Sequence, residues 1–205
     1  IDASLTAATA VTGDSDTTIK TTTSANVAQA STIALSTTGQ VDFDSGIQDD
    51  IGNMSNAGGT AALTAFSNAT ATGSTNGDDD VNVTVNDAVT VAQGTIVAGA
   101  TSGTLDFTTG ISGLAETMAD GEGTVVGNFE TVAGRDTDIQ VVVTDTLNVA
   151  QAATIAAETT GQVDFSNAAG ITDTAAAMAT DNAEGTIVAA FGVATNGTLT
   201  SDGDG

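Results

Sequence analysis

The residues of this chain whose types and spacing could do chemistry are aspartates, which occur in short clusters with glycine, serine or threonine. Each of four clusters holds two aspartates separated by one residue: Asp14 and Asp16, Asp78 and Asp80, Asp136 and Asp138, and Asp202 and Asp204. Carboxylates are hard oxygen ligands of the kind that Ca²⁺ prefers, and a turn can aim two of them at one ion while backbone carbonyls complete the shell. We therefore expect these aspartates to be calcium ligands.

The clusters also have an interpretation without any metal. Aspartate, asparagine, glycine and serine favour turns, so the clusters could simply be solvated loops. The sequence contains neither the EF-hand calcium loop pattern nor glycine-rich nonapeptide calcium repeats. A calcium site here would therefore be nonstandard, with a weak dissociation constant of roughly 10⁻⁴–10⁻³ M, as in extracellular modules.

The composition excludes several classes of function. The 26 acidic residues face only Lys20 and Arg135, which gives a formal net charge of −24. Such a chain lacks the clustered basic residues that bind nucleic acid or an anionic membrane surface. It contains neither His nor Cys, which removes the commonest general base and any disulfide framework. We expect no enzymatic activity, no nucleic-acid partner and no membrane insertion.

The aspartate clusters recur within an internal repeat. Segments 26–43, 90–107 and 148–165 ("NVAQASTIALSTTGQVDF", "TVAQGTIVAGATSGTLDF" and "NVAQAATIAAETTGQVDF") align without a gap, at offsets of 64 and 58 residues. The clusters follow the same spacing and lie at the ends of the aligned units. The sequence predicts three repeats over 17–80 (divergent), 81–138 and 139–205. Residues 1–16 would end a preceding unit or form a cap, and we expect the natural protein to continue beyond the fourth cluster.

Each repeat predicts short strands that alternate with helices. Apolar runs predict strands at 81–85 and 139–143, with a weaker copy at 18–22. A first helix would follow the N-cap residues Asn26, Thr90 and Asn148, and would end at the C′ glycines Gly39, Gly103 and Gly161. A "VDF" or "LDF" strand comes next. Ile111, Leu114, Ala115 and Met118 have the spacing of a second helix, and "TVVGNF" at 124–129 predicts a third strand.

The predicted order β-α-β-α-β favours an α/β fold with parallel strands, because strand–helix–strand crossovers place strands side by side in one direction. At this period the units would form an elongated repeat solenoid or a string of small modules. An all-β sandwich string is the alternative, since Thr- and Val-rich sequences without proline also form strands.

The segment "TDTLNVAQAATIAAETTGQVDF" followed by "ITDTAAAMA" resembles repeats of very large bacterial surface proteins, including cyanobacterial and RTX-type adhesins exported by type I secretion. The resemblance covers all three repeats and is best over 139–191. It implies an extracellular, calcium-dependent stalk or a surface-layer component. The nonapeptide repeats of such proteins are absent from this sequence.

Three hypotheses of function follow. The first is a structural extender or lattice module of a bacterial extracellular surface protein or filament, stiffened by calcium at the repeat boundaries. Its partners would be further copies of the repeat or neighbouring protomers. The second is a ligand-binding module whose Thr-rich strands bind polysaccharide or ice, although the threonines are not in register. The third is an acidic halophilic domain whose charge serves only solubility.

Overall fold

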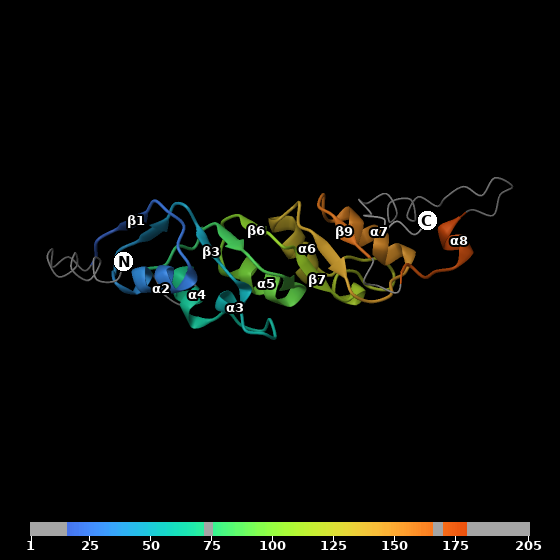
Figure 1. Cartoon of the computed structure of the whole chain (residues 1–205), viewed down its shortest axis with the longest axis horizontal. Helices are drawn as coiled ribbons and strands as arrows, with labels where there is room; N and C mark the ends of the chain where they lie inside the picture. Colours follow the sequence, from blue (N-terminus) through green and yellow to red (C-terminus); the bar gives the residue numbers. More distant parts are fainter. Residues whose placement is uncertain (1–15, 72–75, 166–169, 180–205) are drawn as a thin grey trace. The chain divides into compact units, whose positions relative to one another are not determined.

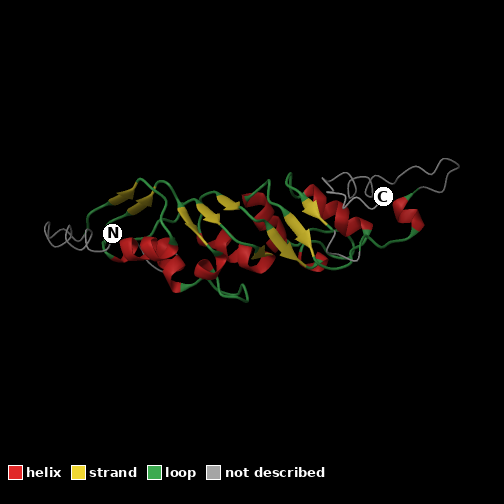
Figure 2. Ribbon diagram, in the orientation of Figure 1, coloured by secondary structure: helices red, strands yellow, loops and turns green. Residues whose placement is uncertain are grey.

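Short strands and helices alternate along the computed structural model, which describes residues 16–71, 76–165 and 170–179 (Figures 1 and 2). Within these residues the helices are α2 (Val27–Leu35), α3 (Ile51–Met54), α4 (Thr64–Ala69), α5 (Val91–Ala100), α6 (Gly127–Arg135), α7 (Val149–Ala157) and α8 (Ala175–Met178), with a 3₁₀ helix η1 (Ala115–Thr117). The strands are β1 (Ile19–Thr21), β2 (Val41–Phe43), β3 (Ile47–Asp49), β4 (Val83–Val85), β5 (Val89–Thr90), β6 (Leu105–Phe107), β7 (Ile111–Gly113), β8 (Val141–Val143) and β9 (Val163–Asp164).

The chain divides into two compact units. One comprises residues 1–88 and 92–108, and the other comprises residues 89–91 and 109–205. The first unit holds the sheets β1–β2 and β3–β4–β6, and the second holds the sheet β5–β7–β8–β9. All strand pairs in these sheets are parallel. The protein is therefore mixed α/β with parallel sheets, and the alternative of an all-β sandwich is wrong.

The pairing of the strands recurs with the spacing of the sequence repeat. The first strand of each repeat pairs with the strand that follows the first helix, in the registers Ile19↔Val41, Val83↔Leu105 and Val141↔Val163. The next strand pairs forward with the first strand of the following repeat, in the registers Ile47↔Val83 and Ile111↔Val141. These partners differ by the same 64 and 58 residues that separate the aligned segments. The exact limits of the repeats at 80 and 138 stay a prediction.

Alternation explains why the "VDF" segments form strands with one face in the core. In β2, Val41 and Phe43 are buried and Asp42 is exposed, and β6 has the same pattern. Successive side chains of a strand point to opposite faces, so the first and third residues of each of these three-residue strands enter the core. Phe66, Phe129 and the two methionines of the same repeats, Met54 and Met118, are fully buried as well.

The predicted N-caps Asn26 and Asn148 are confirmed. Each asparagine side chain accepts a hydrogen bond from the backbone N–H of the glutamine three residues later, and that glutamine side chain accepts one from the asparagine N–H. This reciprocal capping box satisfies two amides that the first turn leaves without intrahelical partners. In the middle repeat Thr90 immediately precedes α5 and belongs to strand β5.

The second half of the middle repeat differs from the predicted order. Ile111 begins strand β7 rather than a helix, and the turn after it is the 3₁₀ helix η1. Segment 124–129, predicted as a strand, instead leads into helix α6, whose Phe129, Val132 and Ala133 are buried. The expected β-α-β-α-β module is thus wrong: the middle repeat continues after β6 with a second strand, a 3₁₀ turn and then a helix.

The repeated glycines do not end the helices as predicted. Helices α2, α5 and α7 end at Leu35, Ala100 and Ala157, which places each glycine three to four residues beyond its helix. Their role is close backbone approach. A Cβ on Gly39 would lie 2.2 Å from the carbonyl oxygen of Asp16, and one on Gly103 would lie 2.3 Å from that of Asp80. Glycine is required because a side chain would overlap this backbone.

Candidate metal centre at the acidic boundary

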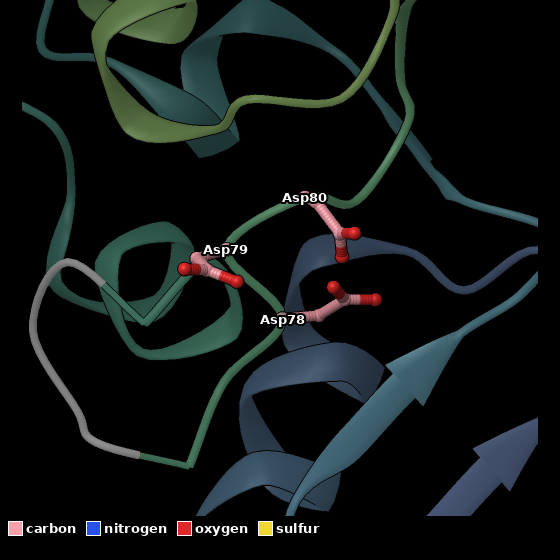
Figure 3. A group of neighbouring side chains, drawn as sticks. All are labelled: Asp78, Asp79 and Asp80. Carbon is pink, nitrogen blue, oxygen red and sulfur yellow. The ribbon is translucent and has the colours of Figure 1, made fainter.

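The structure brings together one group of the predicted ligands. Asp78 and Asp80 lie with Asp79 in a group where each residue offers a carboxylate oxygen, and these oxygens all lie within 4.8 Å of one another. Asp78 is buried, whereas Asp79 and Asp80 are exposed. Figure 3 shows the carboxylates of Asp78 and Asp80 pointing toward each other. Among the described residues this is the only group of three or more acidic side chains close enough to share an ion.

The other predicted ligands that the structure describes are not assembled in this way. Asp16 and Asp138 are exposed and Asp136 is buried. In the described part of the chain none of them belongs to a group of three acidic ligands. Predicted ligands outside the described residues are Asp14, Asp202 and Asp204.

Asp78 has a structural partner as well as acidic neighbours. Its Oδ2 accepts a hydrogen bond of 2.7 Å from the backbone N–H of Phe43, at the end of β2. The pKa of Asp78 is raised from 3.8 to about 6, mainly by burial and also by the hydrogen bond and charge of Asp80, while the hydrogen bond from the Phe43 N–H acts in the opposite direction. A divalent cation at this position would favour the ionised carboxylates and would reverse this shift.

The loop that carries these aspartates is held by a three-residue turn that follows the first helix. Thr101 Oγ1 donates to the carbonyl of Val81 at 2.6 Å, and the N–H of Ser102 donates to the carbonyl of Asp79 at 2.7 Å. The N–H of Gly103 donates to Thr101 Oγ1. We name Thr101–Gly103 the clasp turn of the middle repeat. Its hydrogen bonds occupy the carbonyl oxygens of Asp79 and Val81, which could otherwise be calcium ligands.

The clasp turn recurs in the third repeat. Thr159 Oγ1 donates to the carbonyl of Ile139 at 2.7 Å, and the N–H of Thr160 donates to the carbonyl of Thr137. A Cβ on Gly161 would lie 2.2 Å from the carbonyl oxygen of Asp138. In the first repeat Thr37 Oγ1 donates to the carbonyl of Thr17. The backbone at the boundaries 78–81 and 136–139 is therefore fixed in the same way, although the middle residue is Asp79 in one and Thr137 in the other.

Many other carboxylates bind backbone amides, which the sequence did not reveal. Asp87 Oδ1 accepts from the N–H of Ile51 at 2.6 Å, and Asp145 Oδ1 accepts from the N–H of Ala115 at the same distance. These two aspartates are 58 residues apart and follow β4 and β8, so they are equivalent. The signal that could have found them is their shared position after the first strand of successive repeats.

The same use of aspartate is found at the first helices. Asp49 Oδ2 accepts from the N–H of Val27 at 3.0 Å, and Asp173 Oδ2 accepts from the N–H of Val149 at 3.2 Å. Carboxylates are favourable at such positions because the amides of a first helical turn point outward and carry partial positive charge. Part of the acidity of the chain is thereby explained without a metal.

The arrangement at 78–80 can still hold a hard cation. Among the described residues, none forms an ion pair with these three carboxylates, which supply negative charge and oxygen ligands, and Ca²⁺ takes six to eight oxygens. One oxygen of Asp78 is committed to Phe43. The residues therefore fit calcium as a partial shell that water would have to complete.

No family model, curated protein or solved structure matches this chain. In the described part of the chain, no helix has both the length and the apolar character needed to cross a membrane.

Proposed function

We propose that this chain is a structural extender or lattice module of a bacterial extracellular surface protein or filament. In this proposal its α/β repeats stack into an elongated solenoid, and calcium at the acidic boundaries stiffens the stack. The extracellular location follows from the resemblance of the repeats to those of large bacterial surface proteins. The role is mechanical rather than catalytic.

The observation that carries the proposal is the forward pairing of strands between successive repeats. β3 of the first repeat pairs with β4 of the second in the register Ile47↔Val83, and β7 of the second pairs with β8 of the third in the register Ile111↔Val141. In repeat proteins each unit is stabilised mainly by its neighbours. A shared parallel ladder at both described junctions is a connection that resists extension and can be repeated.

Calcium would act on the same junction. The Asp78 carboxylate accepts the N–H of Phe43 in the first repeat, although Asp78 itself lies just before the first strand of the second repeat. An ion shared by Asp78, Asp79 and Asp80 would remove the repulsion among their charges and fix this loop. The interaction is expected to stabilise the folded state, because the unfolded chain does not fix these three consecutive carboxylates in an arrangement that binds one ion.

The test is a calcium titration followed by thermal unfolding and small-angle X-ray scattering, with each sample compared with NaCl at equal ionic strength. A dissociation constant of about 10⁻³ M predicts about 1.4 kcal/mol of stabilisation at 10 mM calcium, from the linkage of binding to folding. The melting temperature should therefore rise by a few degrees.

Two variants that each remove one negative charge show where calcium binds. Asp80→Asn should remove most of the calcium response, because it removes one carboxylate of the group. Asp106→Asn, an exposed aspartate of β6, removes the same charge and should leave the response intact. If calcium changes neither the melting temperature nor the scattering profile at several millimolar, the role of calcium is wrong. A response that Asp106→Asn abolishes equally would place the ion elsewhere.

A further inference from the structure

The repeat pattern defines a strand position at the outer edge of β1 that no described residue occupies. Among the described residues, β1 pairs only with β2, whereas its equivalents β4 and β8 each lie between two strands. The N–H of Ile19 donates to the carbonyl of Gln40 on the β2 side. Because backbone groups alternate along a strand, the N–H and C=O of Lys20 point to the opposite edge.

The two internal junctions show what such an edge receives. The N–H of Ile47 donates to the carbonyl of Asn82 at 2.8 Å, and the N–H of Ile111 donates to the carbonyl of Gln140 at 2.8 Å. Two residues further along, the N–H of Asn86 donates to Asp49 and that of Thr144 donates to Gly113. The equivalent groups at the β1 edge are the carbonyl of Thr18 and the N–H of Thr22.

The complementary strand lies near the other end of the described chain. Ile171 forms a parallel bridge with Leu147, as Ile47 does with Ala25, so Ile171–Asp173 is the equivalent of β3. The glycine that precedes it, Gly170, has a φ of +88°, close to the values at Gly46 and Gly110.

The surroundings of these glycines differ in one respect. A Cβ on Gly46 would lie 2.6 Å from the carbonyl oxygen of Asn82, and one on Gly110 would lie 2.3 Å from that of Gln140. Among the described residues, a Cβ on Gly170 would meet nothing within 4 Å. Gly170 therefore has the conformation of a junction glycine, and no described residue lies where the receiving strand lies at the other two junctions.

Burial of the equivalent isoleucines agrees with the interpretation that β1 and Ile171–Asp173 are the two halves of a junction. Val83 and Val141 are 1% and 0% exposed, and their strand partners Ile47 and Ile111 are each 1% exposed. The equivalent Ile19 and Ile171 are both only partly buried. Bringing these two isoleucines together would remove apolar surface from water, which favours association.

We propose that copies of this chain associate head to tail, with Ile171–Asp173 of one copy added as a parallel strand to β1 of the next. The register is Ile171↔Ile19, Thr172↔Lys20 and Asp173↔Thr21. The N–H of Ile171 donates to the carbonyl of Thr18, and the N–H of Thr22 donates to the carbonyl of Asp173. The inference rests on the proposed role of the chain as a stacking repeat, and it identifies the surface and the partner.

Analytical ultracentrifugation over a range of protein concentrations tests the association. Each copy carries a net charge of −24, so the experiment is run at about 0.5 M NaCl, where exposed charges are strongly screened. EDTA in a parallel series separates strand addition from calcium bridging. We expect reversible, concentration-dependent oligomers that EDTA leaves unchanged.

Two variants of one residue isolate the strand edge. Lys20→Pro removes the outward N–H and should weaken association at least tenfold. Lys20→Thr introduces the residue found at the equivalent position 84, keeps the N–H, and should change the association constant less than threefold. Both variants lose the ion pairs of Lys20 with Asp42 and Asp44, so those pairs do not account for a difference.

Disulfide trapping gives a second measurement that does not depend on the folding of a proline variant. The chain contains no cysteine, so a Lys20→Cys chain mixed with a Thr172→Cys chain of different tag size should form a mixed disulfide. A Thr131→Cys chain, exposed on α6, replaces the second partner as the control and should not cross-link above background.

The inference is wrong if the chain stays monomeric at all concentrations. It is also wrong if oligomers form that Lys20→Pro does not weaken and the cysteine variants give no mixed disulfide. Oligomers that EDTA dissolves would contradict it too, because calcium bridging would explain them. In each case a preserved response of melting temperature and scattering to calcium would leave the proposed function intact.

Discussion

At the scale of single residues, the clasp-turn glycines show most directly how the acidic boundaries are built. A Cβ at position 103 would lie 2.3 Å from the carbonyl oxygens of both Asp80 and Val81, and backbone cannot move away as a flexible side chain can. We expect Gly103→Ala to lower the free energy of unfolding by about 1–3 kcal/mol, as overpacking typically does. Urea unfolding would measure the change.

The matched control lies four residues earlier. Gly99 is inside α5, and a Cβ there would meet nothing within 4 Å. Gly99→Ala should therefore stabilise the protein by roughly 0.5–1 kcal/mol, through the better helix propensity of alanine. Equal effects of the two substitutions would show that the close approach at Gly103 is not the cause.

Asp78 makes a prediction about pH. Its folded pKa is about 6 against an ordinary 3.8, so between these values the folded protein holds more protons than the unfolded chain. The contribution of Asp78 to stability therefore falls as the pH rises from about 4 to about 6, and is constant above that range. Asp78→Asn keeps an acceptor for the Phe43 N–H but does not titrate.

The difference in unfolding free energy between Asp78→Asn and the parent chain should therefore grow in favour of the variant across this range of pH. Chemical denaturation in EGTA at several pH values would measure it, since a bound cation would oppose the effect. A difference that does not change between pH 4 and pH 6 would show that burial of Asp78 does not perturb its ionisation.

At the scale of the elements, the capping box of α7 is a testable source of local stability. Asn148→Ala leaves the N–H of Gln151 without its acceptor and should cost about 1 kcal/mol, the usual value for loss of an N-cap. Asn148→Asp keeps a side-chain oxygen at the cap and should cost less, although it loses the hydrogen bond from Asn148 Nδ2 to the carbonyl of Gly121. Urea unfolding of both variants compares them directly, and equal losses would assign the effect to the Gly121 contact.

The sequence predicts an element correctly where a local pattern, such as alternation or an N-cap, is compatible with only one secondary structure. The "VDF" strands and the helices after Asn26 and Asn148 were predictable, because strict alternation and N-cap chemistry agree there. Ile111, Ala115 and Met118 were misread as a helix, since a short strand followed by a 3₁₀ turn buries residues at similar spacing. The helix α6 was missed because its buried spacing, Phe129 with Val132 and Ala133, begins only where the apolar run ends.

The candidate site was predictable only in part for a different reason. The spacing of Asp78 and Asp80 indicated that two carboxylates share one turn, and the structure adds Asp79 to them. No local pattern reveals that Asp78 accepts a hydrogen bond from Phe43, 35 residues earlier in the chain. That contact depends on parallel pairing between distant segments, which fixes the boundary loop beside the end of β2.

At the scale of the whole molecule, the excess of acidic over basic residues is the feature with the largest expected effect on stability. A net charge of −24 on 205 residues produces self-repulsion that opposes the folded state. The Debye length falls from about 10 Å at 0.1 M salt to about 3 Å at 1 M, so monovalent salt should relieve much of this repulsion. We expect the melting temperature to rise with NaCl concentration.

A specific effect of calcium on the melting temperature has to exceed this general effect of salt. Screening depends on ionic strength and not on which cation supplies it, whereas a site formed by three carboxylates responds to calcium at millimolar concentrations. In 1 M NaCl the general repulsion is already screened, so stabilisation by added calcium that persists there has to come from bound ions. Melting curves with and without calcium at 0.1 M and 1 M NaCl therefore distinguish a calcium-stiffened repeat from a domain whose acidity serves only solubility. If calcium no longer raises the melting temperature at 1 M NaCl, the acidity serves only solubility.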